Sequence, residues 1–342
     1  MSNPTITAAI DALASRRDLS REQAASVLAQ IMDGAASTAE IAGFLIALRT
    51  KGETEEEVAG LAEAMRAMAT PVRPTRGDLV DTAGTGGGRR TFNVSTTAAL
   101  IAAGAGCAVA KHGNRSATGL SGSADLLEAL GARLDVSPEG VARSIDEAGF
   151  GFMFAPAHHA ATRHVVPVRR DLAVRTIFNL LGPLTNPAGA RRQVVGVADP
   201  GALDLVAGAL ARLGTDRALV VSSVDGLDEL STSGPTHVVE VEEQRLRRYV
   251  VEPEGVGLPR ADPDALVGGT PSENAQATRS ILAGERGSAR DLAVLNAGAA
   301  IYAAGRADSL ADGVESAAAA IDGGAAERAL ERYVALSLEL AR

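Results

Sequence analysis

The sequence predicts an α/β protein in which a small all-helical N-terminal domain precedes a larger domain with a mainly parallel central sheet flanked by helices. Three observations lead to this prediction. The first 70 residues read as helix throughout. Two prolines, Pro71 and Pro74, then interrupt the helical pattern. Beyond them, short apolar runs alternate with helix-length segments, as in parallel strands joined by helical crossovers. We therefore place the domains at residues 1–73 and 74–342.

Capping boxes mark the N-terminal helices. In such a box a Ser or Thr side chain and a Glu or Gln three residues later satisfy each other's backbone amides at a helix start. The three boxes are Ser20 with Gln23, Ser37 with Glu40 and Thr54 with Glu57. After the last box, an apolar stripe recurs at helical spacing over residues 58–68. This stripe predicts packing in a core or a dimer interface rather than a ligand site.

The second part of the chain holds five apolar runs that are typical of strands buried on both faces of a sheet. They are residues 79–81, 107–110, 151–154, 193–197 and 218–221. Ser137 with Pro138, and Asp199 with Pro200, are start signals for two crossover helices. The alternation over residues 236–251 predicts a hairpin with its turn near residues 242–244, and the alanine-rich end of the chain is helical again.

Composition limits the classes of function. With 342 residues, of which 46% are hydrophobic, the chain can bury a sizeable core. Its formal net charge of −9 argues against a general polyanion binder, because affinity for a nucleic acid rests on a surplus of Lys and Arg. We therefore expect no nucleic-acid partner, and an anionic ligand must be held by a local site.

Cysteine content and hydropathy exclude two further classes of site. Cys107 is the only cysteine, so the chain has no intramolecular disulfide and no cysteine-based zinc site, and its apolar surroundings favour a buried thiol. The longest uncharged run, residues 98–110, is too short to span a bilayer, and no signal-peptide pattern is present at the N-terminus. We expect a cytoplasmic protein with no membrane partner.

A glycine-rich turn at residues 81–88 follows the first predicted strand, and residues 93–96 then open a helix. Glycines let backbone amides approach an anion, and a helix N-terminus adds partial positive charge. The turn is not the dinucleotide fingerprint, since Arg89 stands where that motif needs glycine, and it lacks the Gly-Lys ending of a P-loop. An anion site is predicted here, and a tight turn without a ligand is the alternative.

Residues 111–116 follow the second predicted strand, and residues 121–125 start another helix. Because parallel strands end at the same edge of a sheet, both loops are expected to open onto one crevice and to hold one phosphorylated ligand. Lys111 would supply a point charge to a phosphate, and Asn114 offers donors and an acceptor to a polar substrate. A solvated basic loop is the alternative.

A basic run, residues 158–170, is predicted to lie on a helix that continues toward Phe178. It contains three histidines but no His-Glu-x-x-His zinc motif, and it is richer in arginine than in metal ligands. A guanidinium makes two parallel hydrogen bonds to a carboxylate. Arg169 or Arg170 is therefore a candidate for recognising an acid substrate, although a surface ion pair would show the same spacing.

Carboxylates gather after the strand that ends near Val221. They are Asp225, Asp228 and Glu229. Mg²⁺ is usually held by one or two carboxylates together with oxygens of the substrate, so this loop predicts a magnesium site beside a phosphate. Acids that stabilise a helix N-terminus are the alternative interpretation.

Taken together, these motifs resemble the anthranilate phosphoribosyltransferases, a family related to the pyrimidine nucleoside phosphorylases. The match runs through residues 84–87, 93–96, 111–115, 121–125, 179–187 and 225–229 in the family's order and spacing. The resemblance implies a helical domain joined by part of 169–185, a phosphoribosyl pyrophosphate-binding α/β domain, and a homodimer through the N-terminal helices. It also implies transfer of a phosphoribosyl group from phosphoribosyl pyrophosphate (PRPP) to the amino nitrogen of anthranilate, with Mg²⁺ as cofactor.

The same resemblance assigns roles to single residues. PRPP would be held by Gly84, Gly87, Gly88, Thr91, Asn93, Ser95, Thr96, Lys111 and Ser123. The Mg²⁺ ligands would be Ser95, Asp228 and Glu229. Anthranilate would contact Gly84, Asn114 and Arg169, and the catalytic set would be Lys111, Asn114 and Arg169. Because the amine of anthranilate is neutral and nucleophilic at neutral pH, these residues need to position it and to stabilise charge rather than supply a strong base.

One segment departs from the family pattern. The family continues Gly-Thr-Gly-Gly with an aspartate, whereas here Gly88, Arg89 and Arg90 follow and the loop is one residue shorter. The acidic residue that helps to arrange the metal-bound pyrophosphate is therefore absent. We expect an altered Mg²⁺ dependence and a direct contact of Arg89 or Arg90 with the pyrophosphate.

Three other functions are weighed against this one. A pyrimidine nucleoside phosphorylase would share the fold and use free phosphate without metal, but Asp228, Glu229 and Arg169 favour the transferase. A transferase for another aromatic acid would use the same arginine. A non-catalytic paralogue that binds nucleic acid is opposed by the acidic balance and the nearly complete site.

Overall fold

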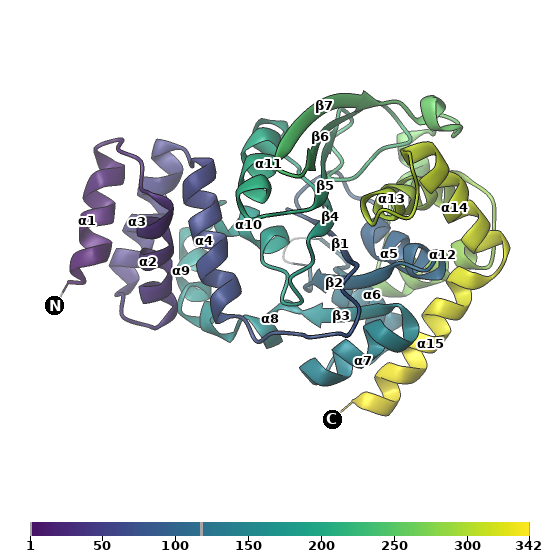
Figure 1. Cartoon of the computed structure of the whole chain (residues 1–342), viewed down its shortest axis with the longest axis horizontal. Helices are drawn as coiled ribbons and strands as arrows, with labels where there is room; N and C mark the ends of the chain where they lie inside the picture. Colours follow the sequence, from purple (N-terminus) through teal and green to yellow (C-terminus); the bar gives the residue numbers. More distant parts are fainter. Residues whose placement is uncertain (1, 117–118, 342) are drawn as a thin grey trace.

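The computed structural model describes residues 2–116 and 119–341. Its N-terminal part is a bundle of four helices at one end of the molecule, namely α1 (Pro4–Ala14), α2 (Arg21–Met32), α3 (Thr38–Lys51) and α4 (Glu55–Met68) (Figure 1). Each of the three predicted capping boxes is formed with both of its hydrogen bonds. Asn3 caps α1, so every helix of the bundle begins at a side chain that satisfies its free amides.

A seven-stranded sheet forms the centre of the larger part, in the order β3-β2-β1-β4-β5-β6-β7. The strands are β1 (Leu79–Gly84), β2 (Ala108–Gly113), β3 (Phe150–Phe154), β4 (Arg192–Gly196), β5 (Arg217–Ser223), β6 (Thr236–Glu242) and β7 (Arg245–Val251). The first five are parallel, and β6 and β7 form the antiparallel hairpin. The predicted fold class, the five strands and the hairpin are all confirmed.

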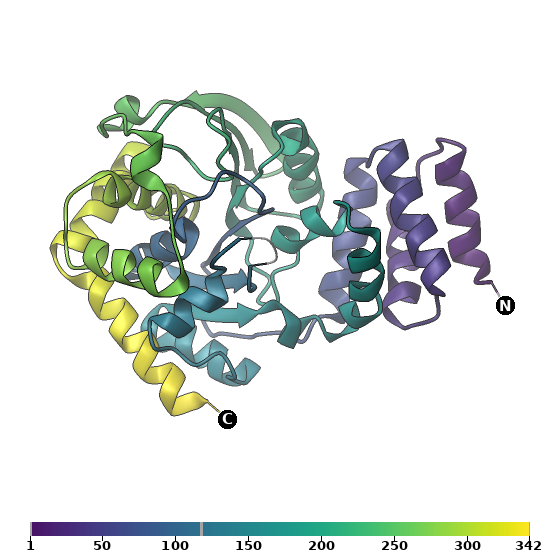
Figure 2. The ribbon, with the colours of Figure 1, turned by 180° about the vertical axis from the view of Figure 1, so that it is seen from behind.

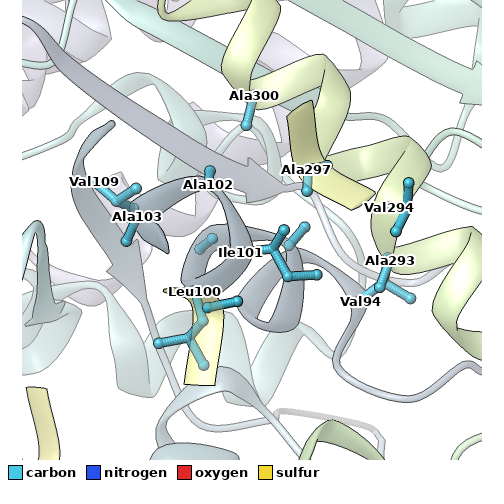
Figure 3. Close-up of a cluster of buried hydrophobic side chains, with 14 of the residues drawn as sticks. Val94, Leu100, Ile101, Ala102, Ala103, Val109, Ala293, Val294, Ala297 and Ala300 are labelled. Carbon is cyan, nitrogen blue, oxygen red and sulfur yellow. The ribbon is translucent and has the colours of Figure 1, made fainter. Parts of the chain in front are cut away.

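One face of the sheet is covered by α5 (Val94–Gly104), α6 (Ser123–Ala129), α12 (Pro271–Leu282), α13 (Ser288–Ala303), α14 (Leu310–Asp322) and α15 (Ala325–Leu340). Alanine is the most frequent residue of this core, and Figure 3 shows alanines of α5 and α13 among larger apolar side chains. A Cβ on Gly104 would lie 2.6 Å from the backbone of Ala326, and one on Gly298 would lie 2.6 Å from the nitrogen of Val314. The helices therefore pack nearly backbone to backbone.

A second core joins the bundle to the other face of the sheet. It includes Phe44 of the bundle, Val165 and Leu181 of the connecting segment, and Val195 and Val220 of the sheet. Helix α11 (Leu203–Arg212) packs against both α4 and the sheet. Seen from behind, the bundle and the C-terminal helices lie at opposite ends of the molecule (Figure 2). The division at residues 73 and 74 stays a prediction, because this core is shared across it.

A third, smaller cluster packs α7 (Pro138–Ala148) against β2 and β3. Ser137 caps this helix, and Gly149 ends it with φ of +74°, as the sequence predicts. Among the described residues, no helix combines the length and the apolar character that a bilayer crossing needs.

The prediction of one helix through residues 158–170 is wrong. The chain instead forms α8 (Ala155–His158), the 3-10 turn η1 (Ala160–His164), α9 (Val166–Leu172), α10 (Phe178–Leu181) and a second 3-10 turn, η2 (Gly182–Leu184). Pro156, Pro167 and Pro183 each lie in the first turn of a new piece, where a proline costs no hydrogen bond. Helix α9 ends at Ala173 in a left-handed conformation and packs against α3 of the bundle.

Candidate active site

The glycine-rich turn follows β1 at the carboxyl edge of the sheet. Gly86 and Gly87 have φ of +67° and +86°, a region that side chains other than glycine rarely adopt. At Gly84 and Gly88 the reason for glycine is different. A Cβ there would lie 2.9 Å and 2.6 Å from carboxylate oxygens of Asp228, so the turn and the loop of residues 225–229, the carboxylate loop, approach more closely than any larger residue allows.

The carboxylates after β5 lie in an irregular turn and not on a helix. The alternative that they stabilise a helix N-terminus is therefore wrong. Asp228 accepts a hydrogen bond from the amide of Gly86 at 2.9 Å. Burial raises the pKa of Asp228, while the backbone hydrogen bonds to its carboxylate and the charge of Arg175 oppose the rise. Glu229 is half-buried, and its desolvation together with the charge of Asp228 raises its pKa to about 8.

These oxygen donors fit a divalent cation. Ser95 and Glu229 line the same narrow pocket, and Gly84 and Gly88 keep the space beside Asp228 free of side chains. The charges of Arg175 and Lys111 only partly offset the desolvation of these two adjacent carboxyls, whose pKa values remain raised, and a bound cation would favour their ionised forms. In residues 2–116 and 119–341 no three His, Cys, Asp or Glu side chains form a metal site alone. A cation held here would therefore need substrate oxygens as well.

Lys111 lies inside β2 and not in the loop after it, where the sequence predicts it, and it is 2% exposed. Its ammonium donates to the carbonyl and the hydroxyl of Thr82 and to the hydroxyl of Ser95, the last at 3.4 Å. Burial lowers its pKa, against the opposing charges of Asp81 and Glu229. The alternative of a solvated basic loop is therefore wrong for Lys111, whose ammonium is buried against Thr82 and Ser95.

The N-terminus of α5 is held by the side chain of Asn93. Its amide donates to the carbonyl of Ser121 at 3.1 Å, and its oxygen accepts from Ser121 and Asn274, each at 2.9 Å. Thr91 is half-buried, and its carbonyl lies 2.3 Å from where a Cβ on Gly268 would be. The hydroxyl of Thr96 is buried without a hydrogen-bond partner among the described residues. This helix start is thus fixed by neighbouring loops.

The loop after β2 carries the other predicted residues. Asn114 is exposed, and its side-chain oxygen accepts from the amide of Arg115 at 2.8 Å. Its carbonyl accepts from the hydroxyl of Ser123 at 3.1 Å, which joins the loop to the start of α6. The structure therefore brings Asn114 and Ser123 together. The side chain of Asn114 is held by one local hydrogen bond, from the amide of Arg115 to its oxygen.

Arg169 lies on α9, the helix that packs against α3 of the bundle. Its guanidinium is half-buried and stacks over the ring of Phe178, 5.4 Å from the centroid. Burial lowers its pKa, and no salt bridge is formed by Arg169 within the described part of the chain. The alternative of a surface ion pair is therefore not what the structure shows. A desolvated guanidinium without a carboxylate partner is suited to a planar acid.

Two arginines beside the turn make contacts that the sequence does not indicate. Arg175, which follows α9, donates to the carbonyl of Gly86 at 2.8 Å. Arg89 pairs with Asp225 at 3.0 Å instead of pointing toward a bound pyrophosphate, so Arg90, which is exposed, remains the candidate for direct contact. No motif or periodicity marks Arg175, since its partner lies 89 residues away in sequence.

A buried polar network fixes the ends of β1 and β2. Asp81 accepts from the amide of His112 at 3.1 Å and from the side chain of Asn186 at 2.7 Å. His112 lies 3.2 Å from the carbonyl of Gly182 through Nδ1, and because a carbonyl only accepts, this nitrogen carries the proton. The rings of His112 and His159 lie 5.1 Å apart. His112 is thus part of the framework that orients the loop.

The buried histidines predict acid sensitivity. Burial lowers the pKa of His112 to about 3 and that of His159 to about 4. In the unfolded chain each would titrate near pH 6.5. Below that pH the unfolded state binds more protons, so the free energy of unfolding falls as pH falls toward the folded pKa values. Between about pH 7.5 and about pH 5.5 we expect a loss of about 1.4 kcal/mol for each histidine in urea unfolding.

The change His159→Gln keeps a donor for the carbonyl of Thr185, which His159 contacts at 3.1 Å. It should therefore remove about 1.4 kcal/mol of the pH-dependent loss. His237→Gln, at an exposed position on β6, is the matched control and should leave the loss unchanged. An identical pH dependence in His159→Gln and in the original chain would contradict the prediction.

Comparison with known proteins agrees with this geometry. Residues 7–69 match the helical bundle domain of a glycosyl transferase family, and residues 76–327 match its a/b domain. The anthranilate phosphoribosyltransferase of Symbiobacterium thermophilum is 53% identical over 94% of each chain. That of Rubrobacter xylanophilus is 54% identical over 94% of this chain and 95% of its own.

Solved structures show the same similarity. The crystal structure of anthranilate phosphoribosyltransferase from Thermus thermophilus has a TM-score of 0.92 and 49% identity, covering 96% of this chain and 99% of that one. The Saccharomyces cerevisiae enzyme in complex with PRPP and Mg has a TM-score of 0.90 and 27% identity, covering 99% of each chain. On the family models and the full-length identities, the chain belongs to the anthranilate phosphoribosyltransferase family.

Proposed function

We propose that the chain transfers the 5-phosphoribosyl group of PRPP to the amino nitrogen of anthranilate, giving N-(5-phosphoribosyl)anthranilate and pyrophosphate, a step of tryptophan biosynthesis. The observation that carries the proposal is the close approach of the Asp228 carboxylate to the glycine-rich turn, the segment predicted to bind an anion. The full-length relatives named for this activity support it. The yeast neighbours, solved with PRPP and Mg and with 4-fluoroanthranilate, support the substrates.

The donor binds at the turn and the two helix starts in this proposal. The residues are Gly84, Gly87, Gly88, Thr91, Asn93, Ser95, Thr96, Lys111 and Ser123. The partial positive charge at the start of α5 and the buried ammonium of Lys111, which donates to the hydroxyl of Ser95, would stabilise the phosphates. The free hydroxyl of Thr96 provides a further donor. No strong base is needed, because the amine of anthranilate is already nucleophilic and these groups need only stabilise charge.

Mg²⁺ would be held by Ser95, Asp228 and Glu229 together with oxygens of the donor. Its chemical contribution, when bound, is to neutralise the charge that collects on the departing pyrophosphate. The raised pKa values of Asp228 and Glu229 fit this role, because a nearby cation favours the ionised form of both carboxyls.

The acceptor side is formed by Arg169, Asn114 and Gly84. The guanidinium of Arg169 binds the carboxylate of anthranilate, and Asn114 hydrogen bonds to its polar edge. The amine then attacks the anomeric carbon of the ribose as the bond to pyrophosphate breaks, and the surplus amine proton passes to solvent. His112 orients the loop, since a histidine with a pKa of about 3 is a weak base.

We also propose a homodimer through the N-terminal helices and a cytoplasmic location. Support for the dimer comes from Ile46 on α3 and Val166 on α9, which are 37% and 44% exposed. These two helices pack against each other, so the exposed apolar side chains belong to adjacent elements. Pairing this face with a second copy would remove both from water.

The test follows the loss of anthranilate fluorescence with purified protein and PRPP during a Mg²⁺ titration. We expect metal-dependent consumption. Asp228→Asn should raise the Mg²⁺ concentration for half-maximal rate by about tenfold, because one of two carboxylates loses its charge. Asp204→Asn, an exposed acid on α11, is the control and should behave as the unchanged chain.

The outcomes separate the alternatives. Consumption of another aromatic acid but not of anthranilate would show that the protein is a phosphoribosyltransferase with a different acceptor. Turnover without any metal would contradict the assigned role of Asp228. No consumption of any aromatic acid at any Mg²⁺ concentration would overturn the proposed activity in favour of a binding function.

A further inference from the structure

The glycine-rich turn and the carboxylate loop are joined by Arg89. Its side chain pairs with Asp225 through Nη2 at 3.0 Å and donates through Nη1 to the carbonyl of Pro263 at 2.9 Å. Its backbone amide donates to the carbonyl of Gly226 at 2.7 Å. Both the backbone and the side chain of one residue therefore bind the turn to the loop that carries Asp228.

Asp225 is a fixed anchor for this contact. It accepts hydrogen bonds from the hydroxyls of Ser223 and Ser231, the second at 2.8 Å, and its side chain is only 16% exposed. The amide of Leu227 lies within 3.4 Å of the same carboxylate. With its oxygens occupied by these donors and by Arg89, Asp225 is not available to a ligand, and its position is set by the end of β5.

The contact lies immediately before the residues that face the donor. Three residues after Asp225, the carboxylate of Asp228 accepts from Gly86 and lies against Gly84 and Gly88. Any separation of the turn from the loop would lengthen these contacts. The Arg89–Asp225 pair therefore sets in part the distance between the glycine-rich turn and the carboxylate of Asp228.

We propose that Arg89 is a positioning residue that holds the glycine-rich turn and the carboxylate loop at the spacing required to bind PRPP together with Mg²⁺. This inference rests on the proposed function. Arg89 acts through Asp225 and does not itself touch the substrate. In the shortened turn, the guanidinium of Arg89 holds the glycine-rich turn and the carboxylate loop in place through its bonds to Asp225 and Pro263.

The test measures binding rather than turnover. Calorimetric titration of PRPP at fixed Mg²⁺ should show about tenfold weaker binding to Arg89→Ala, with a matching rise in the Mg²⁺ needed for half-maximal binding. Arg89→Lys should recover part of the loss, because it keeps the charge but not the two-pronged contact. The KM for anthranilate at saturating PRPP and Mg²⁺ should stay unchanged, which a general loss of structure would not allow.

Two further variants make the test specific. Asp225→Asn should weaken PRPP binding as Arg89→Ala does, and the double variant should be no worse than either single one. Arg248→Ala removes a different arginine from an exposed pair with Asp204 and should bind PRPP normally. Normal binding by Arg89→Ala, or effects that multiply in the double variant, would overturn the inference while leaving the function intact. Failure of the unchanged chain to bind PRPP would overturn both.

Discussion

Replacing Arg169 with alanine is expected to lower kcat/KM for anthranilate by about two orders of magnitude, while the KM for PRPP changes little. The guanidinium is half-buried over Phe178 and forms no salt bridge in the described part of the chain. A carboxylate that enters this place gains charge-assisted hydrogen bonds in a setting of reduced hydration. Without Arg169, the carboxylate would be desolvated and unpaired.

Steady-state kinetics with anthranilate and with aniline would check this prediction. Aniline lacks the carboxylate, so Arg169→Ala should barely affect its slow turnover, whereas the reaction with anthranilate should fall. Arg170→Ala, at an exposed neighbouring position on the same helix, is the control. An equal loss with both amines would mean that Arg169 supports the fold or the donor site instead of the carboxylate.

Gly196→Ala is expected to destabilise the chain by about 3 kcal/mol and to reduce kcat by about a hundredfold. Gly196 ends β4 and pairs in register with Gly84 of β1. A Cβ at this position would lie 1.7 Å from the carbonyl oxygen of Asp228, so the carboxylate loop would have to shift. The shift that relieves this overlap would move Asp228 and Glu229 away from the glycine-rich turn.

Urea unfolding and the fluorescence assay would measure the two effects of Gly196→Ala. Gly255→Ala is the matched control, because a Cβ there would meet no atom within 4 Å. Wild-type stability together with wild-type kcat in Gly196→Ala would show that the loop accommodates the methyl group and would contradict the prediction.

Much of the fold was predictable because its signals are local. The capping boxes at Ser20, Ser37 and Thr54 involve residues three positions apart, and all three formed. The strands were predictable for the same reason, since each is a short apolar run. The single helix predicted for the basic segment is wrong because its prolines begin separate short helices. Periodicity alone does not distinguish these two cases.

The candidate site was predictable where it depends on strand ends and not where it depends on distant partners. The shared edge of parallel strands predicted that Lys111 and residues 93–96 would serve one ligand, and the structure has the ammonium of Lys111 and the hydroxyl of Ser95 3.4 Å apart. The hydrogen bonds of the Lys111 ammonium to Thr82 were not predictable, because Thr82 lies on the neighbouring strand, 29 residues away in sequence. The role of Arg89 depends on Asp225, which is 136 residues away in sequence. No local pattern reports such a pair.

The core shared by the bundle and the sheet means that neither region can be exchanged for an unrelated domain without exposing apolar surface on the other. Phe44 of the bundle and Val220 of the sheet belong to one continuous apolar cluster. A chain reduced to the larger part would expose the sheet face that the bundle and its neighbouring helices cover, and would gain a surface prone to self-association. We therefore expect the two regions to unfold as one cooperative unit, and we expect recombination at their junction to conserve activity only if both sides of the cluster are inherited together.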